Sequence, residues 1–238
     1  MGSKLLGFVS LAALALAACS EKPAEPSAAA PAPAVEAAAA PAVAPPSIEG
    51  LPAGDYKIDP SHATLVFTVN HLGFSHYTAQ FTRFTADLKL DPANPATAQL
   101  SATVDPASLS LPSPPAGFFD ELMSEPWINA KAFPQMTFKS TSVTMTGPNT
   151  ADVTGDLTLR GVTKPVTLAM TFNGGWKGIP QDPHARIGFS AKGALNRSDY
   201  GISTGVPAPG STMGVSDEVT IAIEVEFTGP PMADKPAQ

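Results

Sequence analysis

The sequence predicts an all-β fold, an eight-stranded antiparallel barrel with a short helical lid segment. Apolar and polar residues alternate with a period of two over most of residues 53–229. About eight such stretches follow one another at short spacing, with no long helical repeat between them. A closed antiparallel barrel is the simplest arrangement for such a set, because it leaves no sheet edge exposed.

Residues 1–18 predict a lipoprotein signal peptide. One positive charge precedes an apolar run that is too short to remain in a bilayer as a spanning helix. The run ends in A-A-C and resembles the bacterial lipobox, in which the cysteine is acylated, so we predict lipidation at Cys19. An ordinary signal peptide that contains a cysteine is the alternative. Ser20 resembles the sorting signal for the outer membrane, and we expect a lipid-anchored protein that faces the periplasm.

Residues 19–52 predict a disordered tether rich in Ala and Pro, and residues 230–238 a disordered tail. Frequent prolines break helices and favour extended chain of about 3.1 Å per residue. The tether would therefore hold the following domain several tens of Å from the bilayer. Residues 53–229 have the length of one domain, which is large enough to bury its own core.

Composition excludes several classes of site. Cys19 is the only cysteine, so the domain has no disulfide, thiolate nucleophile or cysteine-ligated metal. The net charge is −7, with 21 acidic and 14 basic residues. Nucleic-acid binding needs clustered Lys and Arg, so nucleic acid is not an expected partner.

The strands are expected at intervals along the whole domain, joined by short turns. Phe81 is out of step with Phe84, which predicts a bend near Arg83. Residues 161–165 predict a hairpin turn and residues 173–178 a loop. In chain order, the predicted strands are 63–70, 84–90, 98–104, 136–145, 150–160, 165–172, 185–195 and 217–227.

One segment, residues 114–135, departs from the alternation. Prolines precede four apolar residues at helical spacing, and a tryptophan follows. We expect a short helix and an aromatic cover over one end of the barrel. The interior of an eight-stranded barrel is either filled by side chains or just wide enough for one small ligand. The residues of this cover are Phe118, Phe119, Leu122, Met123 and Trp127.

Two histidines, His71 and His76, lie five residues apart. Residues at this spacing point to opposite faces of a strand, so only a tight turn through residues 72–74 would bring the two rings together. A metal site would also need a third ligand, such as His62 or Asp59. We favour a polar rim at the mouth of a pocket over a metal site.

Residues 201–205 match G-x-S-x-G, the pattern around a hydrolase nucleophile, here Ser203. The pattern requires a helix after the serine, and Pro207 and Pro209 prevent one. We therefore favour a glycine-rich loop.

Polar residues near the predicted strand ends are candidates for contact with a ligand head group. Arg83 is a candidate cation for a phosphate or carbonyl group, or an exposed strand charge. Arg197 and Asp199 share one face of a strand, and we favour a structural ion pair or barrel-end lock over a head-group contact. Asn196 is a further candidate for orienting the head group.

The chain resembles the YceI-like domain family, the polyisoprenoid-binding, lipocalin-like periplasmic proteins. The resemblance rests on ordered motifs over residues 54–228: IDPSHATLVFTVNHLGFS, FTRFTADLKLD, WINAKAFPQMTFKST, VTGDLTLRGVTKPVTL, LNRSDYGIS and SDEVTIAIEVE. It implies a lipocalin-like barrel with an elongated apolar cavity for a long-chain amphiphile, such as an isoprenoid quinone, a polyprenyl phosphate or a fatty-acid-like lipid. The chain departs from many members before residue 118, where LPSPPAG replaces a charged, His-containing stretch.

We therefore predict non-catalytic binding or transport of such an amphiphile in the bacterial periplasm. The expected partners are this lipid, the membrane through the N-terminal anchor, and a second copy in a homodimer. No cofactor is expected other than an isoprenoid lipid or quinone held as ligand. The alternatives are a hydrolase using Ser203 and a histidine, a metal enzyme, or a filled-barrel envelope stress adaptor with a protein partner. The predicted ligand-binding residues are Phe67, Val69, His71, Phe74, Phe81, Arg83, Phe118, Phe119, Leu122, Met123, Trp127, Phe138 and Asn196.

Overall fold

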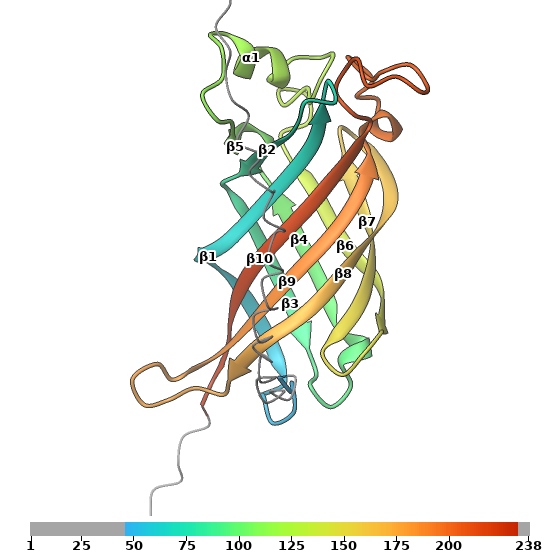
Figure 1. Ribbon diagram of the computed structural model, residues 1–238. Helices are drawn as coiled ribbons and strands as arrows, with labels where there is room; N and C mark the ends of the chain where they lie inside the picture. The colour runs from blue at the N-terminus through green and yellow to red at the C-terminus, as the bar shows by residue number, and fades with distance from the viewer. Residues whose placement is uncertain (1–45, 233–238) are drawn as a thin grey trace, which may run out of the picture. The chain divides into compact units, whose positions relative to one another are not determined.

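The computed structural model describes residues 46–232, which form a closed barrel of eight antiparallel strands (Figure 1). The order around the barrel is β1-β10-β9-β8-β7-β6-β4-β3, and β3 pairs again with β1. The predicted fold class is confirmed. The eight strands are β1 (Gly54–His71), β3 (Phe84–Leu90), β4 (Gln99–Val104), β6 (Met136–Met145), β7 (Thr150–Leu159), β8 (Val162–Trp176), β9 (His184–Asn196) and β10 (Glu218–Pro231).

The remaining elements are short. Strand β2 (Ser75–Phe81) pairs with the second half of β1, and β5 (Leu109–Ser110) pairs with the end of β2. The elements η1 (Pro95–Thr97), η2 (Pro106–Ser108) and η3 (Arg197–Tyr200) are single 3₁₀ turns. The predicted short helix is α1 (Phe118–Met123), at the end of the barrel where β1 ends. No helix within residues 46–232 is long and apolar enough to cross a membrane.

Of the predicted connections, the hairpin turn and the bend near Arg83 are confirmed and the loop is not. The hairpin turn after β7 consists of Arg160 and Gly161, both with positive φ, as a type I′ hairpin turn requires. The predicted loop at 173–178 is wrong, because β8 continues to Trp176 through a bulge and pairs with β9. The bend between β2 and β3 lies at residues 82–83, as predicted.

The base of the barrel, the end at which β1 begins and β10 ends, is closed by a packed apolar cluster. Tyr56 is fully buried there, and its hydroxyl donates to the Pro52 carbonyl at 2.6 Å. Ile48 and Leu51 pack against the same cluster. Residues before 53 therefore take part in the packing, and β10 ends at Pro231. The predicted domain bounds stay predictions. The predicted signal peptide, Cys19, Ser20 and most of the tether and tail lie outside the described residues and stay predictions.

Gly155 of β7 allows a close approach that any side chain would prevent. A Cβ at this position would overlap the ring of Phe138 and lie 2.6 Å from the Lys139 carbonyl oxygen. We expect Gly155→Ala to lower the free energy of unfolding by about 1–3 kcal/mol in a urea titration, because overpacking displaces neighbouring groups. Gly188→Ala in β9 is the control, since the nearest atoms there lie 3.9 Å away. Equal stability of the two variants would contradict this reading.

A bulge in β1 between Ile58 and Ala63 contains a small charge network. Asp59 contacts the ring of His62 at 3.1 Å, accepts from the Ser61 N–H at 2.9 Å and accepts from Arg186 at 2.8 Å. The hydrogen bond with His62, then those from Ser61 and Arg186, lower the pKa of Asp59 to about 2. Arg186 also contacts Asp182 at 3.0 Å, so the network joins β1 to the β8–β9 connection.

We expect this network to make stability depend on acid. A carboxyl group with a lowered pKa stabilises the fold above its unfolded pKa, near 3.8, and that contribution disappears as the pH falls through about 2. Unfolding titrations over this pH window should therefore show a weaker pH dependence for Asp59→Asn than for the wild type. Asp87→Asn, which breaks only an exposed contact with Lys57, is the control. An unchanged pH dependence in Asp59→Asn would count against the network.

Candidate ligand-binding cavity

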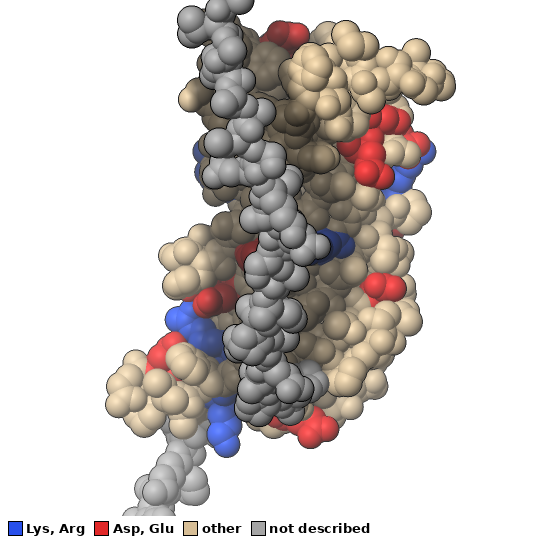
Figure 2. All heavy atoms as spheres, viewed as in Figure 1, with Lys and Arg blue, Asp and Glu red and all other residues tan. Residues whose placement is uncertain are grey.

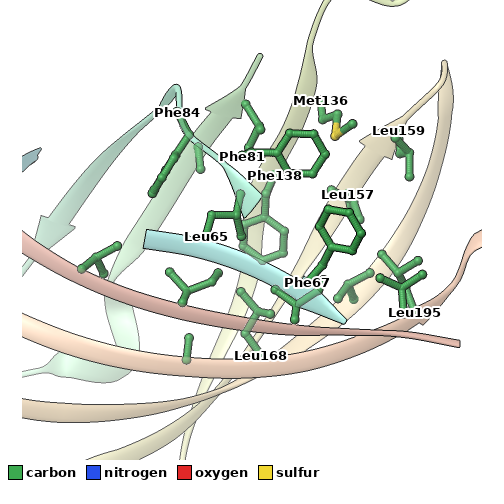
Figure 3. A pocket seen from close by; sticks show the side chains of 18 of the residues that line it. Leu65, Phe67, Phe81, Phe84, Met136, Phe138, Leu157, Leu159, Leu168 and Leu195 are labelled. Carbon is green, nitrogen blue, oxygen red and sulfur yellow. The ribbon is translucent and has the colours of Figure 1, made fainter. Parts of the chain in front are cut away.

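A cavity of about 860 Å³ runs through the interior of the barrel. Its volume lies within the range of roughly 300–1,000 Å³ that small-molecule sites occupy. All eight barrel strands contribute inward side chains, and nearly all of these are apolar. Figure 3 shows the rings of Phe67, Phe81 and Phe138 and several leucines directed into this space.

The cavity is elongated. Five alternate residues of β10 line it, from Val219 to Phe227. Eight residues of strand span about 26 Å, and a strand tilt of roughly 40° reduces this to about 20 Å along the barrel axis. Such a space suits an extended apolar chain better than a compact ring system.

Small side chains explain why part of the interior is open. Ala86 and Ala102 are paired across β3 and β4, and both line the cavity. Ala102 is paired on its other side with Phe138 of β6. Two adjacent alanines cannot reach the opposite wall, so the space in front of them is not filled from this side of the barrel.

Arg197 is the only charged residue that lines the cavity within residues 46–232. It is 5 % exposed and follows the end of β9. Its guanidinium donates to the carbonyl oxygens of Ser216 (2.9 Å), Ile202 (2.9 Å), Thr204 (2.8 Å) and Val215 (2.8 Å). Burial lowers its pKa from the ordinary value, although arginine stays charged. These bonds use four of the five N–H groups, so one N–H of Nη2 remains.

Arg197 therefore locks the upper end of the barrel, the end that carries α1 and residues 201–216. The predicted Arg197–Asp199 pair is wrong, because Asp199 contacts Lys164 at 3.0 Å. The alternative of a barrel-end lock agrees with the structure. The guanidinium also lies 5.4 Å from the ring centroid of Trp127, which places the aromatic cover against the lock. The alternation of Leu195 and Arg197 was the available signal that this arginine points inward.

Eight of the thirteen predicted residues line the cavity. They come from β1, β2, β6 and the segment around α1. The helix covers the upper end with Phe118 and Leu122, which share one helix face at i, i+4 spacing. The eight residues are Phe67, Val69, His71, Phe81, Phe118, Leu122, Trp127 and Phe138.

The other five predicted residues lie outside the cavity lining. Phe119 and Met123 lie about 100° around α1 from the inward face. Arg83 is exposed and donates to Asp105 at 2.7 and 3.0 Å. Asn196 points outward because it alternates with its inward neighbours on β9. Phe74 lies in the β1–β2 turn and is 81 % exposed.

The histidines do not come together. His71 is paired with Ser75 and lines the cavity, whereas His76 is paired with Asn70 and takes the opposite face of the hairpin. Strand β2 was missed because its alternation is short, with only Tyr77, Ala79 and Phe81 as a signal. In the part of the chain that the structure describes, no group of three His, Cys, Asp or Glu side chains could hold a metal ion.

The glycine-rich segment around Ser203 is not a nucleophile elbow. Residues 201–217 form turns and loop, with no helix after the serine. Within residues 46–232, the only side-chain hydrogen bond made by a histidine joins His62 to Asp59. No hydrogen bond in this range joins a histidine to Ser203. The loop follows Arg197 and covers the upper end of the barrel.

The domain matches a known family over almost its whole length: the model of the YceI-like domain aligns with residues 56–227. The chain belongs to the YceI-like family. A UPF0312 protein of Pseudomonas putida F1 is 40% identical over 178 residues, which are 73% of this chain and 86% of that protein. A UPF0312 protein of Pseudomonas syringae pv. syringae is 35% identical over 181 residues, 74% of this chain and 86% of that one.

Solved structures share this YceI-like fold. BcnA of Burkholderia cenocepacia superposes with a TM-score of 0.59 at 26% identity, covering 71% of this chain and 98% of that one. The YceI protein of Campylobacter jejuni gives 0.57 at 29% identity, covering 67% and 89%. A polyisoprenoid binding domain from Saccharophagus degradans has the same fold at 13% identity, with a TM-score of 0.54 and coverage of 74% and 98%.

Proposed function

We propose that this YceI-like protein binds a long-chain amphiphile without catalysing a reaction on it. The observation that supports this proposal is the elongated, almost wholly apolar cavity of about 860 Å³ inside the barrel. Its single charged lining residue among those described, Arg197, lies at the upper end. The apolar chain of the ligand lies along the barrel axis, and its polar head lies toward the upper end.

Burial of the chain supplies the binding energy. Each CH₂ group transferred from water into an apolar environment contributes about 0.8 kcal/mol. Half a dozen carbons therefore contribute roughly 5 kcal/mol before the cost of ordering the ligand. No covalent step is needed for binding of this kind.

The head group is proposed to accept a hydrogen bond at the upper end. Arg197 retains one N–H, and His71 lines the cavity near the same end. A carbonyl or phosphate oxygen is a suitable acceptor for a guanidinium. Isoprenoid quinones, polyprenyl phosphates and fatty-acid-like lipids all combine such an oxygen with a long apolar chain.

The location and assembly of the protein are also proposals. We infer from the A-A-C sequence and Ser20 that the chain is lipidated at Cys19, faces the periplasm and is anchored at the outer membrane. An anchored carrier of this kind would hold or transport lipid next to a membrane. A homodimer remains a prediction.

Purification without detergent tests the proposal. We expect native mass spectrometry to find one bound molecule per chain, and organic extraction to release a molecule with a long apolar chain. After its bound lipid has been removed, the purified protein should also take up added ubiquinone or palmitate. Protein that is empty in several preparations and takes up neither compound would contradict the proposal.

A further inference from the structure

Two large apolar side chains stand out on the surface. Phe74 is 81 % exposed and Met213 is 73 % exposed, more than any other exposed large hydrophobic residue in 46–232. Phe74 belongs to the turn between β1 and β2, and Met213 to the loop before β10. Exposing such side chains to water is unfavourable, and grouped exposure marks a site of interaction.

These two loops form one surface. The Leu72 N–H donates to the Gly214 carbonyl at 2.8 Å, and His71 forms a β-bridge with Val215. Gly73 lies against Thr212 so closely that a Cβ there would be 3.0 Å from the Thr212 hydroxyl oxygen. We call residues 72–74 and 206–214 the apolar rim.

The apolar rim is held in place. The Gly73 N–H donates to the Asn70 side chain at 2.8 Å, which closes the β1–β2 turn. The Val215 N–H donates to the Gly205 carbonyl at 2.8 Å, which closes the second loop. Arg197 holds the chain on either side of that loop through Thr204 and Val215. The exposure of Phe74 and Met213 is therefore a property of an anchored structure.

The apolar rim is continuous with the cavity. Leu72 and Gly214 belong to the rim and also line the cavity, as does the adjacent Val215. A ligand that leaves the upper end would thus pass apolar side chains before it met water.

The apolar rim carries no Asp, Glu, Lys or Arg, although the chain as a whole has a net charge of −7. Figure 2 shows the projecting loop at the upper right without charged residues, while acidic residues lie below it. The neighbouring helix α1 adds Asp120 and Glu121 at the same end. Attraction to anionic lipid is therefore not available here, and contact with a membrane must depend on apolar insertion.

We propose that the apolar rim inserts into the interfacial layer of a zwitterionic phospholipid bilayer and aligns the upper end of the cavity with the membrane. An aromatic and a methionine side chain that project from a closed loop can enter this layer without the rest of the domain. The inference rests on the proposed function, because it assigns the exchange of that lipid to this end. Lipid would then enter and leave without crossing bulk water.

The test uses the full chain mixed with phosphatidylcholine vesicles that have brominated acyl chains. A polarity-sensitive fluorophore is attached through Phe74→Cys, or through Ile179→Cys at the base, where Ile179 is 39 % exposed. The chain without these substitutions gives any background from Cys19. We expect a blue-shifted emission and strong bromine quenching at position 74, and neither at position 179.

Further variants show whether insertion depends on the apolar rim. Met213→Ser should weaken insertion, measured as quenching at position 74, on the order of tenfold. The reason is that burial of one methionine side chain in an apolar layer changes an equilibrium constant by about that factor. Met232→Ser at the base should leave it unchanged. Added phosphatidylglycerol should not increase quenching; a requirement for anionic lipid would overturn the apolar mechanism. Emission that is already blue-shifted without vesicles, and rises with protein concentration, would identify a second copy as the partner and overturn the proposal.

Extraction of bound lipid from the same samples separates this inference from the proposed function. Protein that carries lipid but shows no quenching at position 74 would overturn only the insertion. Protein that inserts but carries and takes up no lipid would overturn only the proposed function. Equal quenching at positions 74 and 179 would overturn the orientation.

Discussion

Replacing Arg197 by methionine is expected to lower the free energy of unfolding by roughly 3–5 kcal/mol, the range seen when one partner of a buried charged interaction is removed. The guanidinium is buried and holds four backbone carbonyls from the segment 202–216. Methionine fills similar space but donates no hydrogen bond, so these carbonyls would need water in its place. Denaturant titration measures the loss.

Two variants define the cause of this loss. Arg197→Lys keeps the charge, but the three N–H groups of one ammonium cannot reach carbonyls on several sides, so we expect an intermediate value. Arg83→Met breaks an exposed pair with Asp105 and should cost less than about 1 kcal/mol. If Arg197→Met were as stable as Arg83→Met, the hydrogen bonds from Arg197 to the four backbone carbonyls would not hold the upper end together.

Ala102→Trp is expected to abolish binding of the long-chain ligand while leaving the barrel folded. Ala102 lines the cavity of about 860 Å³ beside Ala86, so an added indole would extend into this cavity. The added ring would obstruct the axis that an extended chain must follow. In a filled core the same change would instead destabilise the protein by about 1–3 kcal/mol.

Organic extraction and unfolding titration are the two measurements for this variant. We expect extracted lipid to fall by at least about tenfold, the equivalent of losing the burial of two CH₂ groups or more. The stability should stay close to that of the wild type. Ser101→Trp places the same ring on the outer face of β4 and should retain lipid. Retention of lipid in Ala102→Trp would mean that the ligand does not lie along the barrel interior.

The sequence predicted the barrel strands, because a strand with one face buried must alternate with a period of two. The alternation of Leu65 and Phe67 is visible without any partner strand. The short helix could also be predicted, since Phe118 and Leu122 have helical spacing between prolines and before Trp127. The resemblance to the YceI-like family, which is confirmed, also implied an apolar cavity inside the barrel.

The cavity itself could not be predicted from the residues. Whether an interior is filled depends on the summed volumes of side chains from eight strands, and the pairing of Ala86 with Ala102 exists only in the sheet. The aromatic residues Phe74 and Phe81 illustrate the same limit. Both were predicted to bind the ligand, yet Phe81 lies in a strand and lines the cavity, whereas Phe74 lies in a turn and is exposed to solvent.

The strands, the helix and the family follow from the amino-acid sequence, since they depend on local periodicity and on ordered motifs. Which charged residue enters the cavity, and which apolar residues stay outside it, depends on contacts that form only in the folded barrel. Arg197 is recognised as a lock only when the carbonyls of residues 202–216 surround it, and Phe74 and Met213 become one surface only when two distant loops meet. Neither contact leaves a period in the sequence, because one is made by an irregular loop and the other joins loops more than a hundred residues apart.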